Sequence, residues 1–148
     1  MSRLAQDGSK DPRVRQMAES ITRQVFDHDF MSEYSAIYYW VKANVRYVRD
    51  PVLVEQVQTP WATIQVRQGD CDDMATLIAG LIGAIGGRSR FVAGAFKYRR
   101  GRPVLEHVWV EAHDPRSNNW IVLDPVPGRK VGQMLGNLQH TITHPAVE

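Results

Sequence analysis

The sequence predicts an α+β fold in which helices come first and an antiparallel sheet follows. Apolar residues recur at helical spacing through the first half of the chain. Three extended segments with turn-rich connections then occupy residues 89–124. The 148 residues, 43% hydrophobic and 23% charged, are ordinary for a soluble globular protein. We therefore expect a single domain over residues 1–148 with one helix packed on the sheet.

The N-terminal part predicts two amphipathic helices. Residues 1–10 are polar, and we expect them to be irregular. Asp11 and Pro12 are typical of a helix start, and the apolar spacing predicts a helix over residues 12–26. Ser32 can cap the second helix. Its inward stripe is formed by Tyr34, Ile37, Val41 and Val45.

The middle of the chain leads to the clearest helix. A short extended piece is expected at residues 46–49, and Thr59-Pro60-Trp61 predicts one short helical turn. From Cys71 to Ile85 apolar residues recur on one face, and Gly86-Gly87 follows as a left-handed-tolerant end. We expect this helix to be central to the fold.

The C-terminal half predicts a sheet. Strands are expected at about residues 89–98, 104–113 and 119–124, because turn-forming residues separate them. From about residue 128 to residue 148 we expect mostly irregular structure. Trp109 and Trp120 are interpreted as core residues rather than substrate contacts.

Cys71 is the single cysteine and the first candidate for chemistry. Asp70 is a suitable cap for the helix, with Asp73 as its capping-box partner. The positive end of the helix dipole favours the thiolate there, whereas the flanking aspartates oppose it. The thiol therefore needs a histidine that can form an ion pair, and His107 is the candidate base. A lone cysteine is otherwise most often a buried, unreactive residue.

Asp124 is the predicted partner of His107. In an antiparallel pair the indices of opposite residues have a constant sum, and a turn centred between Pro115 and Arg116 sets these two residues opposite each other. Opposed residues share a face, whereas a one-residue slip would separate them. Asp124 would then orient the imidazole while His107 moves the proton.

The transition state also needs hydrogen-bond donors for its oxyanion. The backbone amide of Cys71 is one expected donor. Gln56, Gln58 and Trp61 are the candidates for the second, with Gln58 and Trp61 closer to the start of the helix. The sequence leaves this choice open.

Two C-terminal histidines are the other candidate ligands in the sequence. His140 and His144 lie four residues apart, but no third ligand is near, so we expect no metal and no other cofactor.

The basic run at residues 97–102 is interpreted as a solvated hairpin tip, and nucleic acid is not expected as a partner. No signal-like or membrane-spanning segment is visible, so no membrane association is expected, and the single cysteine fits a reducing compartment. The oligomeric state stays open.

Four blocks of sequence, in order and with matching spacing, resemble the transglutaminase-like superfamily of papain-fold cysteine enzymes. The resemblance covers about residues 35–127. The blocks are Gly-Asp-Cys-Asp-Asp at 69–73, Leu-Ile-Gly-Ala-Ile-Gly at 81–86 with Arg-Phe-Val-Ala-Gly at 90–94, His-Val-Trp-Val-Glu at 107–111 and Trp-Ile-Val-Leu-Asp-Pro at 120–125. The resemblance implies a papain-like fold with Cys71 as nucleophile, His107 as base and Asp124 as orienting acid.

The same resemblance frames the expected function. It implies acyl transfer through a thioester on a peptide or glutamine carboxamide, by hydrolysis as in a protease or isopeptidase or by cross-linking as in a transglutaminase. The alternative is a non-catalytic virion or interaction protein that retains the scaffold. Residues 45–51 and the compact size are similar to forms found in tailed bacteriophages and prophages, which implies a bacterial cytoplasm or the virion. Arylamine N-acetyltransferases and NlpC/P60 peptidases match the pattern less well.

Overall fold

The computed structural model describes residues 1–25, 29–49, 56–133 and 136–147. Five helices and six strands occur in these ranges. They are α1 (Ser2–Lys10), α2 (Pro12–Thr22), α3 (Phe30–Asn44), β1 (Arg46–Tyr47), α4 (Pro60–Val66), β2 (Gln68–Gly69), α5 (Cys71–Ala84), β3 (Ser89–Arg99), β4 (Arg102–Asp114), β5 (Asn119–Leu123) and β6 (His140–Val147).

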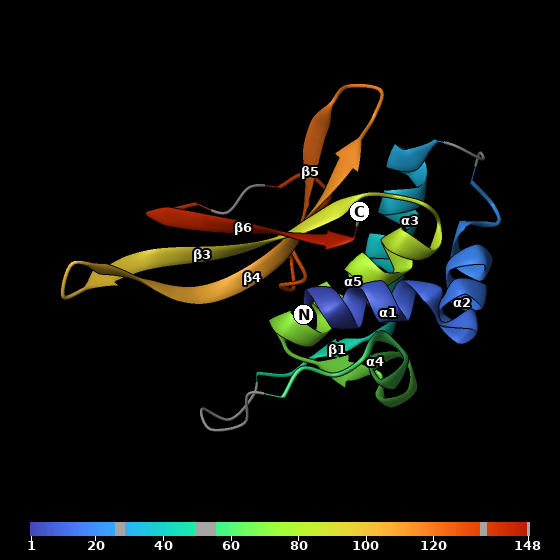
Figure 1. Cartoon of the computed structure of the whole chain (residues 1–148), viewed down its shortest axis with the longest axis horizontal. Helices are drawn as coiled ribbons and strands as arrows, with labels where there is room; N and C mark the ends of the chain where they lie inside the picture. The colour runs from blue at the N-terminus through green and yellow to red at the C-terminus, as the bar shows by residue number, and fades with distance from the viewer. Residues whose placement is uncertain (26–28, 50–55, 134–135, 148) are drawn as a thin grey trace.

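The main sheet has four strands in the order β5-β4-β3-β6, and all its neighbouring strands are antiparallel. Helix α5 packs against β3, β4 and β6, and α1 lies beside both α5 and β6 (Figure 1). The two ends of the chain therefore meet, and the Ser2 hydroxyl donates to the Pro145 carbonyl at 2.7 Å. The α+β prediction is confirmed.

Helix α5 is the centre of the core, as expected. Ten consecutive residues from Asp73 to Ile82 are buried, because α1, α4 and the sheet cover it from different sides. Gly8 and Gly80 leave room for Pro60 of α4, since a Cβ at Gly8 would lie 2.4 Å from the Pro60 ring. Within the described part of the chain, no helix combines the length and the apolar character that crossing a bilayer requires.

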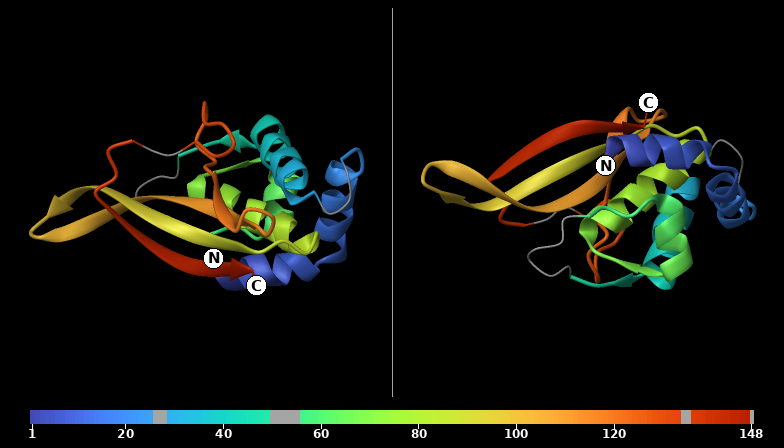
Figure 2. Two further views of the ribbon diagram at one scale, coloured as in Figure 1. Left: turned by 90° about the horizontal axis from the view of Figure 1, so that it is seen from above. Right: turned by 60° about the horizontal axis from the view of Figure 1, so that its bottom comes forward.

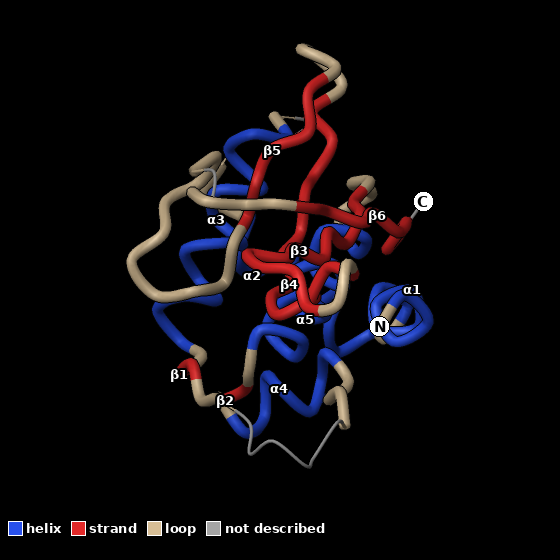
Figure 3. The backbone as a smooth tube through the Cα atoms, turned by 90° about the vertical axis from the view of Figure 1, so that its left-hand side faces the viewer, coloured by secondary structure: helices blue, strands red, loops and turns tan. Residues whose placement is uncertain are grey.

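Several N-terminal expectations are also confirmed. The predicted stripe of α3 is buried, and Thr59 caps α4 by accepting from the amide of Ala62 at 3.1 Å. The two-residue strand β1 pairs in parallel with β2, so the segment before Cys71 is fixed against the end of α3. Figure 3 shows β1 and β2 side by side near α4.

Three N-terminal expectations are wrong. Residues 1–10 form helix α1 rather than an irregular segment, because Ala5 and Gly8 are buried in tertiary contacts that their polar neighbours do not reveal. Helix α2 ends at Thr22, short of residue 26. Asp29, not Ser32, caps α3: its carboxylate accepts from the backbone amide of Ser32 at 3.4 Å and from its hydroxyl at 2.9 Å.

The C-terminal expectation of irregular structure is wrong for β6. Residues His140–Val147 add an edge strand to β3, with His140 paired to Ala95 and Val147 to Ser89. Most of its side chains are exposed, so no alternation of apolar residues marks it. Its stability comes from backbone hydrogen bonds and from the burial of Ala146 and Val147 at its end.

The β4–β5 register is shifted from the predicted one: each residue of β4 pairs with a residue two positions later in the chain than expected. Asp114 pairs with Asn119, so the turn is centred between Arg116 and Ser117. The Asp114 carboxylate accepts from the Arg116 amide and from the Ser117 hydroxyl, which stabilises the turn in this shifted position. Continuing the register would set Asp124 opposite Trp109 rather than His107. Since strand alternation has a period of two, the shift keeps the predicted face.

The start of α5 depends on a buried carboxylate. Asp73 accepts from the Asp70 amide at 3.1 Å and from the Gln58 amide at 2.7 Å, while the Asp70 side chain accepts from the Asp73 amide. Gly69 is required beside it, since a Cβ there would lie 2.6 Å from the Cβ of Asp73. This capping box, predicted from the sequence, fixes the residue that precedes Cys71.

We expect Asp73→Ala to lower the free energy of unfolding by about 2–3 kcal/mol, because it removes the capping box and leaves two backbone amides without acceptors. Thermal and denaturant unfolding would measure this loss. Asp7→Ala is the matched control, since the Asp7 side chain is exposed. A loss no larger than that of the control would contradict the assignment.

Candidate active site

Cys71 and His107 line the same cavity, which has a volume of about 700 Å³. One wall is the start of α5, and a second is formed by β3 and β4. Tyr47 and Arg49 at β1, Val126 and Arg129 after β5, and Met1 complete the lining. Five separate parts of the chain therefore converge on the only thiol in the protein.

Two short strands and the capping box position Cys71. Tyr47 pairs with Gly69, and the amide of Val48 donates to the Gly69 carbonyl at 2.8 Å. Cys71 is the first residue of α5, where backbone amides are unpaired and the helix dipole is positive. The thiol is partly buried and points to the cavity wall, with the side chain of Asp72 at 4.0 Å from the sulfur.

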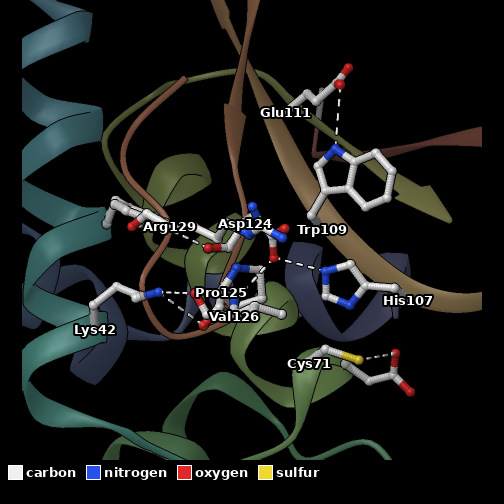
Figure 4. A network of polar contacts seen from close by, with 11 residues as sticks. Lys42, Cys71, His107, Trp109, Glu111, Asp124, Pro125, Val126 and Arg129 are labelled. Atoms are coloured by element: carbon white, nitrogen blue, oxygen red, sulfur yellow. Dashed lines mark hydrogen bonds and ion pairs between the residues drawn. The ribbon is translucent and has the colours of Figure 1, made fainter. Parts of the chain in front are cut away.

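The imidazole of His107 is hydrogen-bonded to Asp124. The distance from Nε2 to the Asp124 Oδ1 is 2.8 Å, and the two side chains are only 10% and 0% exposed. The same oxygen also accepts from the Val126 amide at 3.1 Å. Figure 4 shows the imidazole between Asp124 and the sulfur of Cys71, so the ring's other nitrogen is the one available to the thiol.

Helix α3 fixes the segment that carries Asp124. The Tyr38 hydroxyl lies 2.7 Å from the Asp124 carbonyl and 2.8 Å from that of Arg129. The Lys42 ammonium donates to the carbonyls of Pro125 and Val126 (Figure 4). The acid is thereby held at the end of β5, although β5 itself stops at Leu123.

Trp109 supports the imidazole from within β4. Its ring stacks on that of His107 with centroids 5.8 Å apart, and its indole donates to Glu111 at 3.4 Å. Glu111 in turn accepts from Arg90 at 2.7 Å. Gly94 makes this arrangement possible, because a Cβ there would lie 2.7 Å from the Trp109 ring. Trp109 is buried, as predicted, and it also restrains the orientation of His107.

The electrostatics of the cavity disfavour an isolated thiolate. Burial, followed by the negative charges of Asp72 and Asp70, raises the pKa of Cys71 to about 11, although the backbone N–H of Val108 acts in the opposite direction. The thiol is therefore protonated near neutral pH unless a base accepts its proton. His107 is the basic side chain that the cavity offers beside the sulfur.

The three predicted oxyanion side chains do not line the Cys71 cavity in the described structure. The side-chain oxygen of Gln58 accepts from the Thr63 hydroxyl, and Trp61 lies under the guanidinium of Arg13. Gln56 is exposed. Trp61 is on α4, which packs against α1 and α2, so its ring lies against α2 rather than in the cavity.

Tyr47 is one of the cavity residues that the sequence did not single out. It lines the wall beside Cys71, and burial, followed by the charge of the nearby Cys71 thiolate, raises the pKa of its phenol. The hydroxyl therefore keeps its proton and can donate a hydrogen bond. Tyr47 reaches this place because it pairs with Gly69, two residues before Cys71. Strands of two residues are too short to show a periodic pattern in the sequence, so this pairing could not be predicted.

The two C-terminal histidines lie on β6, so they occupy an extended strand rather than a helix. Four residues of strand separate their Cα atoms by about 13 Å. Among the residues that the structure describes, no group of three His, Cys, Asp or Glu side chains could hold a metal ion.

A family model described as the transglutaminase-like superfamily matches residues 15–125. The chain belongs to this superfamily. The match includes Cys71, His107 and Asp124, which this superfamily member brings to one region of the fold. No curated protein sequence matches the chain.

Solved structures confirm the papain-like, transglutaminase-like fold. A candidate protease from Parabacteroides distasonis is 14% identical, with a TM-score of 0.65 over 80% of this chain and 24% of its own. A candidate cysteine protease from Cytophaga hutchinsonii is 24% identical, with a TM-score of 0.61 over 90% and 50%. LapG from Legionella pneumophila is 14% identical, with a TM-score of 0.55 over 85% and 78%. This chain thus covers about a quarter of the length of the first protein and half of the length of the second.

We expect Cys71 to be alkylated rapidly near neutral pH in the wild type. In His107→Ala the rate should rise only as the pH approaches the thiol pKa of about 11, because only the thiolate reacts. Adding Asp72→Asn should move that midpoint to lower pH, since the Asp72 charge raises the pKa. Rates of iodoacetamide labelling against pH would measure both effects. Identical profiles for the wild type and His107→Ala would contradict the coupling.

Proposed function

We propose that this protein is a cysteine-dependent acyl-transfer enzyme that acts on a peptide bond or a glutamine carboxamide. The observation that carries the proposal is the 2.8 Å hydrogen bond between His107 and the buried Asp124, at the wall of the cavity that contains Cys71. A histidine oriented by an acid beside a thiol is the arrangement that nucleophilic catalysis requires. Membership of the superfamily supports the same class of chemistry.

The proposed reaction begins with proton transfer from the thiol to His107. The sulfur forms a bond to the carbonyl carbon, and the tetrahedral intermediate collapses to a thioester as the C–N bond breaks. His107 donates the proton to the departing nitrogen, and Asp124 stabilises the imidazolium in between. The thiol must first turn from Asp72 toward the imidazole, a rotation about one bond, and such contacts often tighten only when substrate binds.

Two donors would stabilise the oxyanion. The first is the backbone amide of Cys71 at the start of α5. The second is the Tyr47 hydroxyl, in place of the candidates Gln56, Gln58 and Trp61, because it lines the cavity and keeps its proton. The pairing of β1 with β2 places the backbone of Tyr47 beside Gly69, two residues before Cys71.

The second half of the reaction defines the product. Water attacking the thioester gives hydrolysis, whereas a primary amine such as a lysine side chain gives a cross-link. The substrate is therefore proposed as a peptide or protein. A free, essential thiol suits a reducing compartment such as a bacterial cytoplasm.

Mass spectrometry of a glutamine peptide incubated with the protein tests the proposal. We expect a gain of one mass unit by deamidation, cleavage of the backbone, or, with an added alkylamine, a conjugate that retains the amine. Cys71→Ala and His107→Ala should each abolish the product, and Asp124→Asn should lower the rate about 10³–10⁴-fold. No product in any condition, with Cys71 labelled equally slowly in the wild type and His107→Ala, would favour the non-catalytic alternative.

We expect Tyr47→Phe to lower kcat about 10²-fold with little change in KM, because one donor is lost only where the oxyanion develops. Its rate of iodoacetamide labelling should stay at the wild-type value, since that displacement forms no oxyanion. Tyr39→Phe is the control, because Tyr39 is half exposed and outside the cavity. An unchanged kcat, or an equal loss of labelling, would contradict the assignment.

A further inference from the structure

The hairpin of β3 and β4 extends beyond the rest of the sheet. Strand β6 covers β3 only as far as Ala95, whereas β3 continues to Arg99 and β4 begins at Arg102. Figure 1 and Figure 2 show this part of the hairpin projecting from the body of the protein. We call residues 96–105 the arm. Its tip is a tight turn with positive φ at Arg100 and Gly101, and residues 97–102 are exposed.

The arm is strongly basic. Its four cations are Lys97, Arg99, Arg100 and Arg102, and residues 95–105 contain no acidic side chain. Lys97 lies 3.9 Å from Glu106. No carboxylate in the described part of the chain forms an ion pair with the three arginines, all of which are exposed. The tip therefore presents guanidinium groups that are free to bind an anionic partner.

The base of the arm is also a wall of the Cys71 cavity. Phe96, Leu105 and Glu106 line that cavity together with His107. Leu105 is 47% exposed, so an apolar surface leads from the cavity toward the basic tip. His107 lies five positions after Arg102 along β4, a span of about 17 Å, which is the length of about five extended residues of a bound chain.

From this continuity we propose that the arm binds an acidic segment of the polypeptide whose carboxamide or peptide bond reacts at Cys71. The proposal rests on the proposed function. The acidic residues would lie about five to seven positions from the reacting residue, the distance from cavity to tip. A polypeptide fits better than a nucleic acid, because Tyr98 is the one aromatic side chain near the tip and offers no platform on which successive bases could stack.

Fluorescence anisotropy with the Cys71→Ala protein tests the arm without requiring turnover. The probes are two labelled glutamine peptides, one with a block of glutamates six residues from the glutamine and one with serines there. We expect the acidic peptide to bind at least tenfold more tightly at low salt, with a difference that shrinks as ionic strength rises. Combined Arg99→Gln, Arg100→Gln and Arg102→Gln should remove the difference.

The matched control removes the same charge elsewhere, with Arg15→Gln, Arg23→Gln and Arg116→Gln at exposed positions, and should keep the preference. Equal binding of the two peptides, or an equal loss in the control, would overturn the proposal. Tighter binding of a single-stranded oligonucleotide than of the acidic peptide, lost in the arm variant, would also overturn it. Because the readout is binding, a missing activity would reject the proposed function while leaving this result interpretable.

Discussion

The site depends on one buried hydrogen bond, between the imidazole of His107 and the carboxylate of Asp124. Asp124 is fully buried, and burying a carboxylate raises the free energy of the folded state unless hydrogen bonds compensate. Its hydrogen-bond partners must therefore be held in place by the fold. The imidazole provides one partner and the Val126 amide another. The interaction that orients the proposed base therefore also satisfies one oxygen of the acid, Oδ1, whereas the buried Oδ2 has no hydrogen-bond partner among the described residues.

Much of the surrounding structure serves to hold these two groups. Helix α3 binds the carbonyl of Asp124 and those of the residues that follow it through Tyr38 and Lys42, and Trp109 stacks on the imidazole from β4. On the other side of the cavity, the capping box and the β1–β2 pair fix Cys71. The nucleophile and the base thus belong to separately stabilised parts of the fold, and the cavity is formed where those parts meet.

Local signals were sufficient for much of this arrangement. The capping box of Asp70 and Asp73, the apolar face of α5 and the turn-rich connections each arise from neighbouring residues, and the structure confirms them. The predicted register, which sets His107 directly opposite Asp124, differs from the observed one by two residues along β5. The contact between the two side chains still forms, because a shift of two residues leaves both on the same face of the sheet. Helix α1, strand β6 and the place of Tyr47 depend on contacts between distant parts of the chain, which no local pattern encodes.

The ultraviolet absorbance of the Cys71 thiolate, compared near neutral pH in the wild type and in His107→Ala, tests the central claim most directly. Burial and the charges of Asp72 and Asp70 raise the pKa of the thiol to about 11, so a thiolate near neutral pH requires a base that accepts its proton. We expect thiolate absorbance in the wild type and its loss in His107→Ala. Identical absorbance in the two proteins would show that the thiol and the imidazole do not share a proton, and it would contradict the account.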